Sequence, residues 1–281
     1  MKALYPLGLV FCVAITHLAQ GADSFKLEPN ATVRLDFPDL PDTLATVASG
    51  ERQVARLTAT LPANYTREGK FPLFVFLNGG DGGRGDGLPI PRQQVVPRDF
   101  ICVSLPLFKD THNTNDGGLV SMEDFSTVSR CYRTMFQKLF DDVPNITPER
   151  STLGGFSNGA HTIGILLAGQ DEFTLSHFRA FCFAEGGFGP LAANVLRKSA
   201  MRSCRFLLLR GDKADDDRPE SKAEREHNTH LALALELEAR EHHLDFTSIV
   251  MNGHGHELPS DYITLLGQWV RGEKISDSEK R

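Results

Sequence analysis

The chain has 281 residues, of which 41% are hydrophobic and 23% charged, and these values are ordinary for a globular protein with a buried core. Its formal net charge is −6 at pH 7. This acidic balance disfavours a nucleic-acid partner, because binding to phosphates needs clustered Lys and Arg side chains.

Residues 1–21 have the layout of a secretory signal peptide. Lys2 is followed by an uncharged, mostly apolar run that ends at Ala19, and small residues stand at Gly21 and Ala22. The apolar run barely reaches the length of a membrane span and polar residues interrupt it, so we expect no stable insertion in a membrane. The sequence therefore predicts a secreted or periplasmic protein that is cleaved after Gly21 or Ala22.

Residues 22–281 contain no internal repeat, low-complexity tract or linker, which favours a single domain. Alternating polar and apolar residues predict a half-exposed strand within 53–65. Short apolar runs that end in or beside Gly or Pro predict strands within 71–80, 100–106, 150–156, 178–187, 204–212 and 246–255. Helix-compatible segments at 121–142, 158–169 and 229–244 lie between them, whereas the acidic stretch 211–226 is typical of a solvated loop. This alternation predicts an α/β fold with a mostly parallel sheet.

Four cysteines follow residue 21. Cys102, Cys182 and Cys204 lie in or beside apolar runs, and Cys131 lies within a predicted helix. Buried free thiols are the simplest interpretation of these positions.

The five residues Gly155-Phe156-Ser157-Asn158-Gly159 carry the strongest chemical signal. Their G-x-S-x-G spacing allows a strand to turn sharply into a helix, because side chains at the two glycine positions would collide with neighbouring elements. Such a turn exposes the serine hydroxyl. A predicted strand and a predicted helix flank the motif, so we interpret Ser157 as a nucleophile.

A serine hydroxyl needs an imidazole to take its proton, and a carboxylate to orient that imidazole. Loops at the carboxyl ends of three predicted strands supply these groups in the order Ser157, an aspartate within 212–217, and a histidine within 254–256. This is the chain order of the α/β-hydrolases.

From about Val54 to Trp269 the chain resembles secreted serine esterases of the α/β-hydrolase fold, a group that includes polyhydroxybutyrate depolymerase-like, feruloyl and acetylxylan esterases. The resemblance rests on "GGFSNGA" and on "GHGHELP", although this chain has Asn78-Gly79 where the family usually has His-Gly. It implies a mostly parallel central sheet with helices on both faces and no large lid domain.

The resemblance also implies residues for the catalytic triad. His256 fits the family pattern, since it follows a glycine and precedes a polar residue and a proline, and His254 is the alternative. Aligned from its "Asp-Arg-Pro" side, the acidic loop places the acid at Asp215. The other candidates for the acid are Asp212, Asp216 and Asp217.

In that family the backbone N–H of the residue after the nucleophile helps to hold the negative oxygen of the tetrahedral intermediate, and here that residue is Asn158. A second N–H comes from the loop after the third strand, where Gly80 is the first choice and Asp81 the second. The implied reaction is hydrolysis of a small or polymer-attached ester, such as an acyl or feruloyl group on a polysaccharide. It proceeds through an acyl-enzyme and needs no cofactor.

Three other interpretations compete with an esterase. His254, His256, Glu257 and the aspartates 215–217 include the residue types of a metal site, but a metal would leave the serine turn unexplained. A serine peptidase of the same fold would use the same triad, and a non-catalytic binding protein would carry a broken one.

Three aromatic residues that follow predicted strands are candidates either for the substrate pocket or for the core, namely Phe108, Phe156 and Phe188.

Overall fold

The computed structural model describes residues 27–85, 99–110 and 118–275. Eight strands form one sheet in the order β1-β2-β4-β3-β5-β6-β7-β8, in which β1 and β2 are antiparallel to their neighbours and all other pairs are parallel. The strands are β1 Thr32–Phe37, β2 Ala55–Thr60, β3 Phe71–Leu77, β4 Ile101–Ser104, β5 Ile146–Phe156, β6 Ala180–Ala184, β7 Arg205–Gly211 and β8 Asp245–Met251. The predicted signal peptide lies outside the described residues.

Each of the seven predicted strands overlaps a strand of the sheet, so the mostly parallel α/β architecture is confirmed. Strand β1 was not predicted from the sequence. It pairs in antiparallel register with β2, from Thr32 opposite Thr60 to Phe37 opposite Ala55. Its side chains alternate between exposed and buried along the strand. The alternation of polar and apolar residues in its sequence, TVRLDF, could have predicted this strand.

Helices connect most of the parallel strands. The helices of the described residues are α1 Leu44–Ser49, α3 Phe125–Asp142, α4 Asn158–Ala168, α5 Glu172–His177, α6 Phe188–Ala192, α7 Pro219–Glu241 and α8 Ser260–Arg271, with 3-10 turns at Met122–Asp124 and Ser199–Ser203. The helices predicted at 121–142, 158–169 and 229–244 are therefore present.

Helix α7 differs from its prediction at its start. It begins at Pro219, so the second half of the stretch predicted as a solvated loop is helical. Proline suits the first turn of a helix, where its missing N–H costs no hydrogen bond. Leu233 and Leu237 are exposed on this helix, whereas Leu235 is buried. The spacing of these leucines at every second residue therefore does not place them on one buried face, as it would in a strand.

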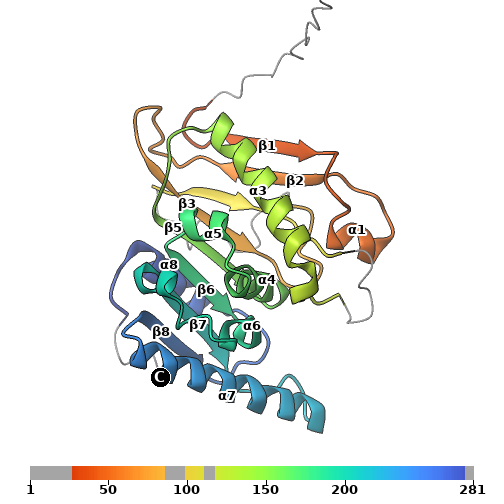
Figure 1. The fold of residues 1–281 in the computed structure, drawn as a ribbon, viewed down its shortest axis with the longest axis vertical. Helices are drawn as coiled ribbons and strands as arrows, with labels where there is room; N and C mark the ends of the chain where they lie inside the picture. Colours follow the sequence, from red (N-terminus) through yellow and green to blue (C-terminus); the bar gives the residue numbers. More distant parts are fainter. Residues whose placement is uncertain (1–26, 86–98, 111–117, 276–281) are drawn as a thin grey trace, which may run out of the picture.

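The sheet separates two hydrophobic cores. Along β3, Leu73, Val75 and Leu77 belong to the larger core, while Phe74 and Phe76 belong to the smaller one, as the alternation of a strand requires. Helices α3, α4 and α7 pack in the larger core and α8 in the smaller, which confirms helices on both faces. Figure 1 shows α3 and α4 lying across one face of the sheet.

The four cysteines after residue 21 are buried and free, as predicted. Burial raises the pKa of the Cys131 thiol to about 11, which keeps it protonated at neutral pH. Within the described part of the chain, no helix combines the length and the apolar character that crossing a bilayer requires.

Candidate active site

Ser157 lies in a strained turn between β5 and α4. Its backbone angles are φ 52° and ψ −119°, a conformation that residues with side chains rarely adopt. A Cβ atom on Gly155 would lie 2.5 Å from the carbonyl carbon of Gly159, and one on Gly159 would lie 2.6 Å from the backbone oxygen of Asn78. Both positions of the motif therefore require glycine, because any side chain there would collide with a neighbouring backbone.

The hydroxyl of Ser157 meets the ring of His256, which lies in the loop between β8 and α8. The distance between Ser157 Oγ and His256 Nε2 is 2.8 Å, within hydrogen-bonding range. The Phe156 ring lies on the same histidine, with the two ring centroids 5.0 Å apart. The structure thus brings together the predicted nucleophile and the predicted base, which are 99 residues apart in the sequence.

A carboxylate that was not predicted from the sequence faces the other ring nitrogen of His256. Glu185 directly follows β6, and because Phe156 pairs with Ala184 across β5 and β6, Ser157 and Glu185 leave the sheet side by side. Glu185 Oε2 lies 3.5 Å from His256 Nδ1, and the Glu185 side chain is only 1% exposed.

The pKa values of this pair shift toward the charged forms. The interaction with Glu185 raises the pKa of His256, although partial burial opposes it. Burial alone would raise the pKa of Glu185, but the nearby His256 ring and the hydrogen bonds from Arg225 and the N–H of Gly211 outweigh burial and leave that pKa below its ordinary value. Glu185 is therefore a carboxylate at neutral pH.

Arg225, from α7, also binds Glu185. Its Nη2 lies 2.8 Å from Glu185 Oε2 and its Nη1 lies 3.2 Å from Oε1, so the two planar groups meet in a bidentate pair. The N–H of Gly211 also donates to Glu185 Oε1. These bonds leave the carboxylate little freedom to rotate.

Asp215, the predicted acid, binds the backbone of the histidine loop. Its Oδ1 accepts the main-chain N–H of His256 at 2.6 Å, and its side chain is 57% exposed. Asp212 acts in the same way three residues earlier in the chain, because its Oδ1 accepts the N–H of Gly253 at 2.6 Å. Both aspartates thus support the loop that carries the histidine, and the assignment of Asp215 to the imidazole stays a prediction.

The remaining candidates for the acid have other partners. Asp216 pairs with Arg218 at 2.7 Å and Asp217 with Lys222 at 3.1 Å, both on the exposed side of the loop before α7.

The alternative histidine has a different partner as well. The distance between His254 Nδ1 and Glu257 Oε1 is 2.7 Å, and the His254 ring packs edge-on against Tyr262. Among residues 27–85, 99–110 and 118–275, no three His, Cys, Asp or Glu side chains gather closely enough to hold a metal ion.

The side chain of Asn158 joins the two loops on the other side of Ser157. Its Nδ2 donates to the backbone oxygens of Gly80 and Gly118, each at 2.9 Å, and its Oδ1 accepts the N–H of Val120 at 3.0 Å. The side chain therefore fixes the loop after β3 against the segment before α3. The roles of the Asn158 and Gly80 N–H groups toward an oxyanion stay predictions.

A hollow of about 360 Å³ opens beside the nucleophile. It is lined by Ser157, Asn158, Gly80, Asp81, Gly118, Leu119, Leu44 and Ala48. Leucine and alanine side chains thus contribute an apolar part of the lining, and the loops of the predicted oxyanion site contribute the rest. The hollow can take an apolar group whose reacting carbon lies at Ser157.

Of the three aromatic residues left open by the sequence, only Phe156 lies at the site. Phe108 is fully buried and packs on Tyr132, and Phe188 is buried in the larger core.

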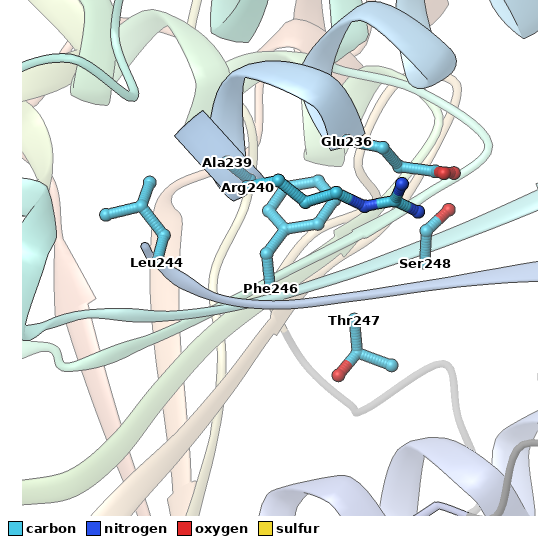
Figure 2. Close-up of a pocket in the computed structure, with 7 residues that line it drawn as sticks. All are labelled: Glu236, Ala239, Arg240, Leu244, Phe246, Thr247 and Ser248. Carbon is cyan, nitrogen blue, oxygen red and sulfur yellow. The ribbon is translucent and has the colours of Figure 1, made fainter. Parts of the chain in front are cut away.

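A second pocket of about 310 Å³ lies between α7 and the first half of β8. Figure 2 shows Arg240 and Phe246 beside each other on the α7 side of the strand, with Thr247 directed to the opposite side. The pocket is lined by residues 236–248, toward the amino end of β8, whereas the site residues follow the carboxyl ends of the strands. It takes no part in the site.

Comparison with known proteins gives structural neighbours only: no family model matches the sequence, and neither does a curated protein. A ferulic acid esterase superposes with a TM-score of 0.54 at 14% identity, over 86% of this chain and 97% of that one. The feruloyl esterase module from Clostridium thermocellum, a mutant complexed with sinapinate, gives a TM-score of 0.51 at 15% identity, over 87% and 88% of the two chains.

The chain has the α/β-hydrolase fold. An isopeptidase of which this chain spans 39% also superposes, with a TM-score of 0.51 at 13% identity over 86% of this chain. Ser157 lies in the turn between strand β5 and helix α4.

The sequence "AFCFAEGG" could have pointed to Glu185 as a site residue, because this acid directly follows an apolar strand, at the carboxyl edge of a parallel sheet.

Proposed function

We propose that this chain is a serine esterase that hydrolyses carboxylic esters through an acyl-enzyme. The observation that carries the proposal is the 2.8 Å distance between the hydroxyl of Ser157, in its strained turn, and Nε2 of His256. A hydroxyl held in this way beside an imidazole is the arrangement that nucleophilic acyl transfer needs.

The reaction follows from these two groups. Ser157 Oγ attacks the ester carbonyl carbon while His256 Nε2 takes the hydroxyl proton. The tetrahedral intermediate then collapses, the bond to the alcohol breaks, and the imidazolium returns the proton to the leaving alkoxide. Water, deprotonated by the same imidazole, attacks the acyl-enzyme and releases the acid and the free serine.

The negative oxygen of each tetrahedral intermediate needs hydrogen-bond donors. In this proposal the donors are the backbone N–H groups of Asn158, at the start of α4, and of Gly80, with Asp81 as the second choice. The shared hollow around Ser157, Gly80, Asp81 and Asn158 supports this placement. The bonds from the Asn158 side chain support it too, because they hold the Gly80 loop in place before the substrate arrives.

The substrate class is an ester with an apolar or aromatic acyl group. The hollow beside Ser157 supports this, since Leu44, Ala48 and Leu119 line it. The signal peptide predicted over residues 1–21 favours a substrate outside the cytoplasm. Acyl or feruloyl groups attached to polysaccharides are therefore our first choice.

The test compares the mature protein with Ser157→Ala on p-nitrophenyl esters of increasing acyl length, on acetylated and feruloylated sugars, and on matched anilides. We expect ester hydrolysis that falls by about a million-fold in the variant, because the covalent step is lost. Circular dichroism checks that the variant is folded. Equal activity in the two proteins would overturn the proposal, and hydrolysis of anilides in preference to esters would replace it with a peptidase.

A further inference from the structure

Two carboxylates lie within reach of His256, and they contact different parts of it. Glu185 Oε2 lies 3.5 Å from the ring nitrogen Nδ1, whereas Asp215 Oδ1 accepts the main-chain N–H at 2.6 Å. The hydrogen bond to Nδ1 is the one that selects the tautomer in which Nε2 is free to take a proton.

We propose that Glu185 is the positioning carboxylate that orients the His256 ring, and that Asp215 holds the backbone of the histidine loop instead. The proposal rests on the proposed esterase function for its catalytic meaning, and it adds a residue that the resemblance to known esterases does not supply.

The surroundings of the two carboxylates support this division. Glu185 is 1% exposed, is fixed by the bidentate pair with Arg225 and accepts the N–H of Gly211. Asp215 is 57% exposed, and its nearest cation is Arg225 at 3.9 Å. A buried, fixed carboxylate stabilises an imidazolium more strongly than an exposed one, because water screens the exposed charge.

The backbone at Glu185 and Gly186 packs directly against the turn that carries Ser157. Glu185 has φ 52°, in the left-handed region that residues other than glycine seldom occupy. The next residue, Gly186, packs so closely on Ser157 that an added Cβ would lie 3.0 Å from the Cα of Ser157. The turn after β6 is thus fitted against the turn that carries the nucleophile.

The experiment compares two matched carboxylate-to-amide variants, Glu185→Gln and Asp215→Asn, in the full mature protein. The first measurement is the pKa of the His256 imidazole by NMR, assigned with His256→Gln, and it needs no substrate. Among the described residues, three charged groups act on this ring: Glu185 and Asp215 raise its pKa and Arg225 lowers it. We expect Glu185→Gln to lower the pKa of His256 by more than Asp215→Asn does.

The second measurement is the pH profile of kcat on the ester that the wild type hydrolyses best. We expect Glu185→Gln to lower the plateau by roughly 10³- to 10⁴-fold and to move the acidic limb to lower pH. Asp215→Asn keeps an oxygen that can accept the main-chain N–H, so we expect a loss of less than about tenfold. The proposal would be overturned if Asp215→Asn lowers kcat more than Glu185→Gln does and also changes the pKa of His256 more.

Two controls keep the result decisive. If Glu185→Gln fails to fold, Asp215→Asn decides alone, since its side chain is exposed: near wild-type kcat supports the proposal and a thousandfold loss overturns it. If Ser157→Ala retains full activity, the esterase function is wrong, while the NMR comparison still tells which carboxylate faces the ring.

Discussion

At the scale of single residues, the site depends on backbones that approach each other closely. The turn at Ser157 brings α4 onto the end of β3, and Gly159 forms the contact because it has no side chain. The strain at Ser157 is sustained only while this contact holds the turn closed.

We expect Gly159→Ala to lower kcat/KM by at least about a hundredfold, because the new methyl group would lie 2.6 Å from the backbone oxygen of Asn78 and must push α4 away from β3. The free energy of unfolding should fall by about 1–3 kcal/mol, as in other overpacked sites. Enzyme assays and urea unfolding measure the two effects.

The matched control is Gly189→Ala in α6, where an added Cβ meets no atom within 4 Å. This variant should keep wild-type activity and stability. If Gly159→Ala behaves in the same way, the close contact is not what holds the nucleophile.

At the scale of elements, loops around the site are fixed by buried polar contacts. Lys109 and Asp124 form an ion pair of 3.2 Å with side chains 4% and 0% exposed, and it ties the segment after β4 to the start of α3. Asp124 Oδ2 also accepts the N–H of Ser121 at 2.7 Å. Together with Asn158, these contacts hold the wall of the hollow that contains Leu119.

The short helix α1 forms another wall of that hollow. Thr43 caps it, since its side chain accepts the N–H of Thr46, and Gly50 ends it in a left-handed conformation. We expect Ala48→Trp to raise KM for long or aromatic acyl groups about tenfold or more and to leave acetyl esters nearly unchanged, because the indole would fill part of the hollow.

A chain-length panel measures this selectivity. Val47→Trp is the control: Val47 is 40% exposed on the same helix and does not line the hollow. Equal effects of the two variants, or equal loss on all esters from Ala48→Trp, would show that the hollow does not bind the acyl group.

At the scale of the whole molecule, the buried ionic site makes stability depend on pH. The pKa of Glu185 is lowered in the folded protein, so the folded state binds its proton less readily than the unfolded state does. Its stabilising contribution is therefore complete above the ordinary pKa of 4.5 and is lost as the pH falls through the lower folded value.

We accordingly expect the difference in free energy of unfolding between the wild type and Glu185→Gln to be largest near neutral pH and to shrink as the solution is acidified below pH 4.5. Urea unfolding of both proteins at several pH values measures it. A difference that grows in acid would mean that burial, and not the bonds to Arg225 and His256, dominates the pKa of Glu185.

The sequence by itself determined the α/β architecture, seven of the strands and the turn at Ser157. These features follow from local properties, namely apolar runs bounded by glycine and the spacing of the two glycines around the serine. It also indicated His256 through its neighbours in "GHGHELP". The sequence did not predict β1, because six alternating residues are too short a pattern to indicate a strand unless the pairing with β2 is known.

Only the tertiary structure decided which carboxylate faces the histidine ring. Chain order pointed to an aspartate within 212–217 and the resemblance to Asp215. The register of β5 with β6 brings Glu185 beside Ser157, and Arg225 reaches Glu185 from the part of α7 that was predicted as a loop. Burial and the direction of a side chain depend on contacts between residues far apart in the chain. Residue types and their spacing do not contain that information.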